Sequence, residues 1–287
     1  MNIFLIIPAA LLLLIIFGIP LFRYLWLSFN AASVITGLEA IPNHGANWVR
    51  IIGDERFWQD ALQTFRFTAI SVSIEMIIAI GIAILLNQKF RNRGLVRTLT
   101  ILPWALPTTI MALGWRWIFN TPYGPIEQFY SQIGMQPANI LSNPSITWLA
   151  TVIADVWKTT PFITIILLAG LQSIPNELYE AFHLEGGGKS QAFRAITLPL
   201  LKPYLLISIL FRIAQAFGVF DLIQIMTGGG PAGSTESLSI YAYLNAMRFL
   251  DFGYSATIII FSFILLILFC LLCWTLIVTT KRIFYRI

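Results

Sequence analysis

Long runs of apolar residues, separated by shorter polar loops, set the pattern of this chain from end to end. A helix that crosses the hydrocarbon layer of a bilayer needs about 20 mostly apolar residues. The stretches that meet this requirement are 3–27, 65–87, 98–119, 147–171, 203–226 and 255–279. The loops between them hold Gly, Pro, Asn and nearly all of the charge. The pattern predicts an all-α transmembrane protein with six spanning helices.

Composition agrees with a protein that lies in a lipid bilayer. The chain has 287 residues, of which 57% are hydrophobic and 11% are charged, and its mean hydropathy is +0.79. Charged residues make up about a quarter of an average soluble domain. The net charge of +5 does not indicate nucleic-acid binding, because the basic residues are spread over separate loops.

Histidine and cysteine form no metal or redox motif in this sequence. His44 and His183 are far apart, and no acidic cluster is placed to chelate a metal. Cys270 and Cys273 form a CxxC pair inside an apolar run, whereas a zinc or redox pair needs a polar, accessible setting. We therefore expect no metal site. The first stretch has no basic segment before it and no small-residue cleavage site after it, so we expect a retained helix.

Lys and Arg are distributed unevenly between alternate loops, and this bias predicts the orientation. The more basic side holds Lys89, Arg91, Arg93, Arg97, Lys189, Arg194, Lys202, Lys281, Arg282 and Arg286. Five basic residues lie on the other side and three fall within the stretches. Both termini are therefore predicted to be cytoplasmic. We expect residues 1–60 to form a first helix with an external segment, 61–280 a transmembrane domain with a cytoplasmic loop at 172–202, and 281–287 a cytoplasmic tail.

The loop at 172–202 departs most clearly from the apolar pattern. Its centre, residues 177–199, reads ELYEAFHLEGGGKSQAFRAITLP. Pro175 and Asn176 favour the start of a helix, and the glycines at 186–188 break it. Ser190 can begin a second helix, which Pro199 is expected to close. The residues predict two short helices joined by a bend.

The spacing in this loop resembles the EAA loop of permease subunits in binding-protein-dependent ABC importers. Glu180-Ala181 is followed at the family's spacing by Gly186 and then by Ile196-Thr197-Leu198-Pro199. The resemblance implies that Glu180, Ala181, Glu185 and Gly186 contact an ATPase. The loop departs from the family's pattern in three places: Phe182 replaces the second Ala, Glu185 stands where Asp is usual, and Gly187 stands where Ala is common.

The same resemblance implies a set of partners and a location. The partners would be a second homologous permease, two ATPase subunits that hold ATP and Mg, and an extracytoplasmic solute-binding protein. The location would be a bacterial-type inner membrane. The chain itself would be non-catalytic and carry no cofactor. Two glycine runs, at 228–235 and 186–190, imitate a phosphate loop, but neither follows a buried strand as that motif requires.

Further blocks resemble the sugar-importing branch of these permeases, the group of the maltose, trehalose and glycerol-phosphate systems. In chain order they include LPWALP (102–107), WRWIFN (115–120), VWKTTPF (156–162), AGLQSIPNELYEA (169–181), ITLPLLKP (196–203), TGGGP (227–231) and DFGY (251–254). They imply a carbohydrate or carbohydrate-like solute. Within TGGGP, predicted to be external, Gly228, Gly229, Gly230 and Pro231 would dock the binding protein. A plain surface loop is the alternative for that segment.

Polar residues inside the apolar stretches indicate a solute pathway, because buried charge in a membrane normally faces a wet cavity or a partner. The predicted pathway residues are Trp157, Lys158, Asp155, Arg212, Gln215, Asp221 and Gln224. Packing ion pairs, Lys158 with Asp221 or Arg212 with Asp155, are the alternative. An ion-coupled secondary transporter that uses Glu75, Asp155 and Asp221 also stays open, although no inverted halves are visible. So does an importer for a solute that is not a sugar.

Overall fold

The computed structural model of the chain describes residues 7–137 and 139–284, with side chains described up to residue 275. In this part, the helical segments long and apolar enough to cross a membrane are Ile7–Ser28, Glu55–Asn87, Pro144–Gln172, Lys189–Phe217 and Phe252–Thr275. A bent pair, Arg93–Ala105 with Thr108–Ile118, can supply a sixth crossing. The predicted all-α transmembrane fold is confirmed. Arg286 and the side chains of Lys281 and Arg282 lie outside the described part.

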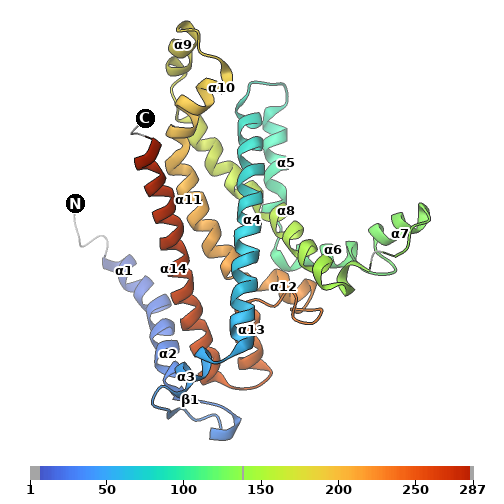
Figure 1. Cartoon of the computed structure of the whole chain (residues 1–287), viewed down its shortest axis with the longest axis vertical. Helices are drawn as coiled ribbons and strands as arrows, with labels where there is room; N and C mark the ends of the chain where they lie inside the picture. The colour runs from blue at the N-terminus through green and yellow to red at the C-terminus, as the bar shows by residue number, and fades with distance from the viewer. Residues whose placement is uncertain (1–6, 138, 285–287) are drawn as a thin grey trace. The chain divides into compact units, whose positions relative to one another are not determined.

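The elements follow one another along the chain with short connections (Figure 1). They are α1 (Ile7–Leu13), α2 (Ile19–Ser28), β1 (Asn30–Ala31), β2 (Ile41–Pro42), α3 (Ala46–Ile52), α4 (Glu55–Asn87), α5 (Arg93–Ala105), α6 (Thr108–Ile118), α7 (Pro125–Gln132), α8 (Pro144–Gln172), α9 (Asn176–Leu184), α10 (Lys189–Ala192), α11 (Leu198–Phe217), α12 (Asp221–Met226), α13 (Leu238–Met247) and α14 (Phe252–Phe284). The two strands pair antiparallel, with Asn30 opposite Pro42.

Two of the predicted stretches are not single straight helices. The stretch 98–119 bends by 90° between α5 and α6. Pro107 restricts the residue before it, and Leu106 accordingly takes the extended conformation that ends α5. The stretch 203–226 ends as a helix at Phe217, and Gly218 follows before α12 begins. The prediction that Asp221 and Gln224 share a helix with Arg212 is therefore wrong.

The chain divides into two compact units. The first unit comprises Met1–Thr64 and Glu236–Leu268, and the second comprises Phe65–Thr235 and Phe269–Ile287. Both α4 and α14 contribute residues to each unit.

The second unit is built around α8. Helices α5 and α11 pack against α8, and α12 packs against α6 and α8. An apolar core at one end joins α6, α8 and α12 through Met111, Ala112, Phe119, Ile140, Ala150, Ala154, Leu222 and Met226. In Figure 1, α9 and α10 lie at one end of α8 and α11, whereas α7 and α12 lie at the opposite end. The second unit therefore has two distinct ends joined by long helices.

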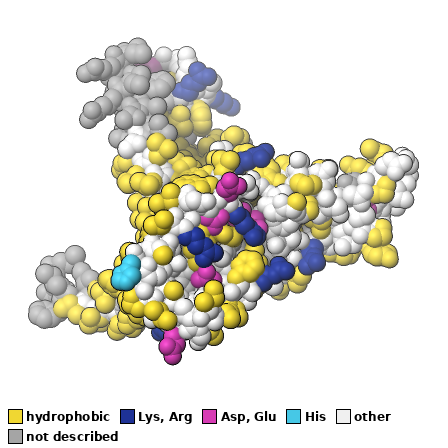
Figure 2. All heavy atoms as spheres, turned by 60° about the horizontal axis from the view of Figure 1, so that its bottom comes forward, with side chains coloured by type: hydrophobic (Ala, Val, Ile, Leu, Met, Phe, Trp, Pro, Cys, Tyr) yellow, Lys and Arg dark blue, Asp and Glu magenta, His cyan; other side chains and the backbone are white. Residues whose placement is uncertain are grey.

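Large apolar side chains are exposed over the long helices, as a lipid-facing surface requires. Phe17, Phe22, Leu62 and Ile77 are each more than half exposed. Hydrophobic side chains cover much of the face seen in Figure 2, with basic and acidic side chains gathered in its middle. We expect lipid or partner helices to cover this apolar surface.

The first unit is held by the carboxylate of Asp54, which precedes α4. One carboxylate oxygen accepts from the hydroxyls of Tyr241 (2.6 Å) and Tyr254, and the other accepts from the backbone N–H groups of Arg56 and Phe57. Burial raises the pKa of Asp54, but these bonds outweigh it and leave the pKa below its ordinary value. Burial and the bond to Asp54 raise the pKa of Tyr241 to about 12. At neutral pH the carboxylate of Asp54 is therefore ionised, and it accepts a hydrogen bond from the protonated hydroxyl of Tyr241.

Gly253 begins α14 at the point where that helix passes closest to β1. A Cβ at this position would clash with the carbonyl oxygen of Asn30 and lie 3.1 Å from the backbone nitrogen of Ala32. The side chain of Asn47 donates to the same Asn30 carbonyl at 3.0 Å. The glycine within the DFGY block therefore has a packing reason: only a residue without a side chain fits against this backbone.

We predict that Gly253→Ala destabilises the folded protein by about 1–3 kcal/mol, because the backbone of β1 or α14 must move to admit the methyl group. Thermal unfolding of the detergent-purified protein would measure this as a fall in Tm. Gly81→Ala is the matched control, because Gly81 lies in α4 with nothing within 4 Å of its Cβ position. Equal Tm values for the two variants would contradict the packing account.

Candidate functional site

The segment between α8 and α11 forms the predicted helix, bend and second helix. Helix α9 ends at Leu184, the bend occupies 185–188, and α10 begins at Lys189. Glu180, Ala181, Glu185 and Gly186 are all exposed, and Leu184 is 89% exposed. Gly186 has a φ of +86°, a conformation that favours glycine. The predicted ATPase-contact residues therefore share one protruding segment at the end of α8 and α11 (Figure 1).

The second helix of this segment differs from the prediction at both of its ends. It begins after Gly188, whose N–H donates to the side chain of Gln191 at 2.8 Å, and not at Ser190. Pro199 does not close it. A π-helical turn over Phe193–Thr197 widens the helix there, with the N–H of Leu198 bonded to the carbonyl of Phe193. Such a turn accommodates a proline that cannot donate, so the helix runs on from Lys189 to Phe217.

Two departures from the EAA pattern compensate for each other in the bend. Phe182 is half-buried, and its ring lies where a Cβ on residue 187 would be. The N–H of Gly187 donates to the carbonyl of Phe182 at 3.0 Å, and the carbonyl of Gly187 lies 2.7 Å from Nδ1 of His183. The larger side chain at 182 therefore requires the smaller one at 187.

Arg212 is the centre of a buried charge network in the second unit. From α11 its Nε and Nη2 donate to the carboxylate of Glu75 on α4, at 2.6 and 2.8 Å. Its Nη2 also donates to Asp155 on α8 at 3.0 Å. Glu75 accepts a further bond from the hydroxyl of Thr159 at 2.7 Å. The Arg212 and Glu75 side chains are 2% and 0% exposed, so water does not screen this network.

Arg212 is therefore bonded to side chains of two other helices, and it also contacts a third polar side chain, on its own helix. Its Nη1 donates to Oε1 of Gln215, one turn further along α11, at 2.9 Å. The structure confirms the ion pair between Arg212 and Asp155 that the sequence offered as an alternative. Glu75 is the dominant partner, and the sequence singled it out only as an ion site of a secondary transporter.

The other predicted pathway residues lie apart from this network. Lys158 donates to the carbonyl of Leu106, at the break between α5 and α6, at 2.7 Å. It is not paired with Asp221 in the part of the chain that the structure describes. Trp157 is exposed and its ring lies 5.8 Å from that of Trp115. Asp221 and Gln224 belong to α12, where Asp221 is exposed and Gln224 is half-buried.

The TGGGP segment forms a closed loop directly after α12. The hydroxyl of Thr235 lies 2.7 Å from that of Thr227 and donates to the carbonyl of Gly230 at 2.9 Å. Gly228 and Gly229 have φ values of +62° and +90°, which explains glycine at both positions. Gly228 is exposed, Gly229 is buried, and Gly230 and Pro231 are half-buried. The loop is a shaped surface feature of the second unit.

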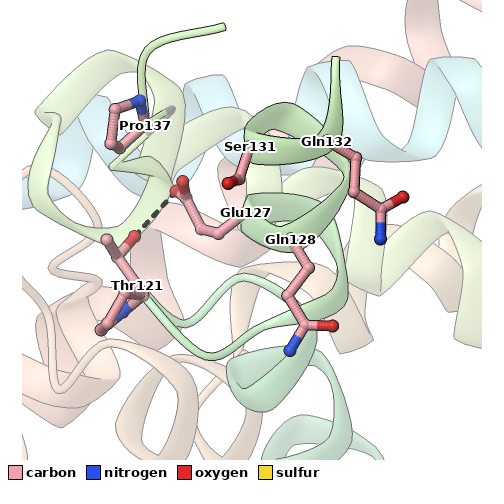
Figure 3. A pocket seen from close by; sticks show the side chains of 7 residues that line it. Thr121, Glu127, Gln128, Ser131, Gln132 and Pro137 are labelled. Atoms are coloured by element: carbon pink, nitrogen blue, oxygen red, sulfur yellow. Dashed lines mark hydrogen bonds between the residues drawn. The ribbon is translucent and has the colours of Figure 1, made fainter. Parts of the chain in front are cut away.

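A cavity of about 390 Å³ beside α7 was not expected from the sequence. Figure 3 shows Glu127 at its wall, with Thr121 and Ser131 beside it. Buried Glu127 accepts from the hydroxyl of Thr121 and from the backbone N–H of Asn139, both at 2.8 Å. The one sequence signal that could have singled out Glu127 is its place as an acid in the first turn of a helix that begins at Pro125. Through these bonds Glu127 joins the segments that precede and follow α7.

Comparison with known proteins identifies the class of transport protein. Residues 75–280 match the family described as binding-protein-dependent transport system inner membrane component. The chain belongs to this family. It is similar to the trehalose/maltose transport system permease protein of Thermococcus litoralis, with 39% identity over 265 residues, 92% of this chain and 89% of that protein. It is also similar to the sulfoquinovosyl glycerol transport system permease protein of Agrobacterium fabrum, with 35% identity over 90% of this chain and 84% of that protein.

The fold of this chain is also similar to that of a solved structure. A bacterial ABC transporter involved in the import of the acidic polysaccharide alginate matches with a TM-score of 0.81 and 20% identity, over 95% of this chain and 93% of that chain. The resemblance to binding-protein-dependent ABC importer permeases is therefore confirmed. The chain is a membrane component of such a transport system, and no cluster of metal-binding side chains is found among the residues described.

We predict that Gly187→Ala loosens the bend between α9 and α10, because the added methyl group would clash with the Phe182 ring. Limited proteolysis should then cut at 185–188 faster than in the unchanged protein. Adding Phe182→Ala should restore the original rate, since the two changes couple through one contact. Gly188→Ala is the control, because its Cβ would meet only Gln191 Oε1 at 3.6 Å. Equal cleavage rates for the Gly187 and Gly188 variants would contradict this packing.

Proposed function

We propose that this family member is the membrane-spanning permease subunit of an ATP-driven carbohydrate importer. A second homologous permease would complete the pathway, and two ATPase subunits with ATP and Mg would bind beneath it. An extracytoplasmic binding protein would deliver the solute. The chain would sit in a bacterial-type inner membrane with both termini and the α9–α10 segment in the cytoplasm, as the Lys and Arg distribution predicts.

The observation that carries this proposal is the exposed α9–α10 segment, which lies at the end of two helices that are bonded to each other. Helix α8 leads into the segment and the helix from Lys189 to Phe217 leads out of it. Arg212 on the second helix is bonded to Asp155 on the first. A displacement imposed on Glu180, Ala181, Glu185 and Gly186 by an ATPase would therefore move both helices together. The chain would transmit the energy of ATP hydrolysis without catalysing it.

The opposite end of the second unit suits delivery of solute. The shaped loop of Gly228, Gly229, Gly230 and Pro231 lies there and would receive the binding protein. The pathway would be lined by Trp157, Lys158 and Gln215, while Asp155 and Arg212 support it from within. Asp221 and Gln224, on α12, would stand near its outer entrance. The names of the two curated relatives, for trehalose or maltose and for sulfoquinovosyl glycerol, support a carbohydrate as the solute.

A secondary transporter is less well supported by these contacts. Both Glu75 and Asp155 are bonded to Arg212, and Asp221 is exposed on a short helix. Carboxylates that already neutralise a guanidinium are poorly placed to bind a coupling ion.

We predict that Glu180→Ala strongly weakens the association with the ATPase subunit. Loss of a central charged contact in an interface typically costs about 2–4 kcal/mol, so recovery of the ATPase should fall by roughly tenfold or more. The tagged chain would be purified from its native membrane in mild detergent, and its partners identified by mass spectrometry. The unchanged chain should bring down a second permease and an ATPase.

The matched control is Glu177→Ala, an exposed acid one turn earlier on α9. It should keep most of the ATPase. Equal losses for both variants would mean that general charge, and not the Glu180 position, holds the partner. Recovery of the chain alone, with uptake abolished by an ionophore but not by ATP depletion, would contradict the importer.

A further inference from the structure

The guanidinium of Arg212 is already paired with two carboxylates of the chain, so it is not available to bind an anionic solute. Its Nε and Nη2 are bonded to Glu75 and Asp155, and its Nη1 is bonded to Gln215. The side chain is 2% exposed. An arginine in a pathway usually suggests recognition of a carboxylate, sulfonate or phosphate. Here two carboxylates of the same chain already occupy that role.

Groups of the same chain also engage three further cations of the second unit, Lys158, Arg116 and Arg66. The ammonium of Lys158 is bonded to the Leu106 carbonyl, where it satisfies the end of the broken helix α5. Arg116, on α6, donates to the carbonyl of Ile225 at 3.2 Å. Asp221 adds an exposed carboxylate. The guanidinium of Arg66, on α4, lies over the ring of Trp148.

Gln215 is the exposed member of the bonds that Arg212 makes. It is exposed, whereas Arg212 behind it is buried. A guanidinium can only donate, so the amide of Gln215 must turn its oxygen towards Arg212. The NH₂ group is then left to donate outward. Such a group suits the oxygens of hydroxyls and of glycosidic links.

We infer that the pathway accepts uncharged carbohydrates and discriminates against acidic ones. Gln215 supplies a hydrogen-bond donor to the solute, and Arg212, held by Glu75 and Asp155, is a positioning residue that fixes the orientation of that donor. This inference rests on the proposed function and narrows its solute.

Saturation-transfer NMR would test the discrimination directly on the importer complex, purified without its binding protein. The probes are maltose and trehalose, and a disaccharide of glucose and glucuronic acid at the same millimolar concentration. Signal from a neutral sugar and none from the acidic one is expected. Equal or stronger signal from the glucuronic acid disaccharide would overturn the inference and leave the importer intact. Failure of the complex to take up any carbohydrate with its binding protein present would instead contradict the proposed function.

Gln215→Glu tests the positioning of the donor. The new carboxylate can keep the bond to Arg212 but has no NH₂ group and adds a negative charge. ATP-driven uptake of the neutral sugar into proteoliposomes should show KM raised by roughly tenfold with the maximum rate little changed. An unchanged KM would overturn the role of Gln215.

Glu75→Gln tests the neutralisation of Arg212. Removing this charge leaves the guanidinium with only Asp155, so the glucuronic acid disaccharide should become a competitive inhibitor of neutral-sugar uptake. Glu55→Gln removes the same charge from an exposed position on the same helix and should cause no such inhibition. If neither variant is inhibited, the claim that Glu75 neutralises Arg212 is contradicted. If Glu75→Gln does not assemble into the importer, the Gln215→Glu variant decides the inference.

Discussion

The cost of burying charge in a membrane protein is the constraint from which the arrangement of the second unit follows. A guanidinium without a partner is very unfavourable in a low-dielectric interior, and so is each carboxylate. Arg212, Glu75 and Asp155 come from three helices, and the guanidinium donates to both carboxylates at distances of 2.6 to 3.0 Å. Removing Arg212 would leave both buried carboxylates without their cation, and removing either carboxylate would leave the guanidinium with one anionic partner. The three helices α4, α8 and α11 are thereby held in one register.

This register connects the two ends of the second unit. The helix that carries Arg212 continues through a π-helical turn to the bend at 185–188, and α8 reaches the same segment from the other side through α9. The segment is thus anchored to two helices that are themselves bonded together. At the opposite end, α12 and the loop of Gly228–Pro231 follow the same helix after its break at Gly218. The fold therefore places each of the two segments proposed to bind partners at an end of the bonded helix pair.

Much of this could be predicted from the sequence, because hydrophobic length and turn residues are local signals. The apolar stretches and the two-helix loop with Gly186 at its bend follow from residues that lie close together in the chain. The pairing of Arg212 with Glu75 does not, since 137 residues separate them and several carboxylates were equally available. The break at Gly218 was missed because the apolar run continues through it. Pro199 has no backbone N–H to donate, and the π-helical turn over Phe193–Thr197 lets the helix continue without that bond. Residue preference alone does not reveal this.

The family blocks gain physical reasons from the structure. Gly253 of the DFGY block lies against the backbone of Asn30, and Tyr254 donates to Asp54. Phe182 and Gly187 depart from the family's pattern as a matched pair. Neither relation is visible in a single sequence, because each depends on a contact or a bend that the spacing does not specify. These two departures concern local packing, and Glu180 and Ala181 of α9 keep the family's residues.

A double-mutant cycle between Glu75→Gln and Arg212→Gln tests the central claim most directly, that these two charges exist in the folded protein chiefly for each other. The free energy of unfolding would be measured for both single variants and for the pair, under the same detergent conditions. If the charges are paired as described, each single change takes an ionic partner away from a buried charge, which costs about 3–5 kcal/mol. The double variant should then be less destabilised than the sum of the single variants by about 1–3 kcal/mol. Additive effects would contradict the pairing and, with it, the register on which the rest of the account depends.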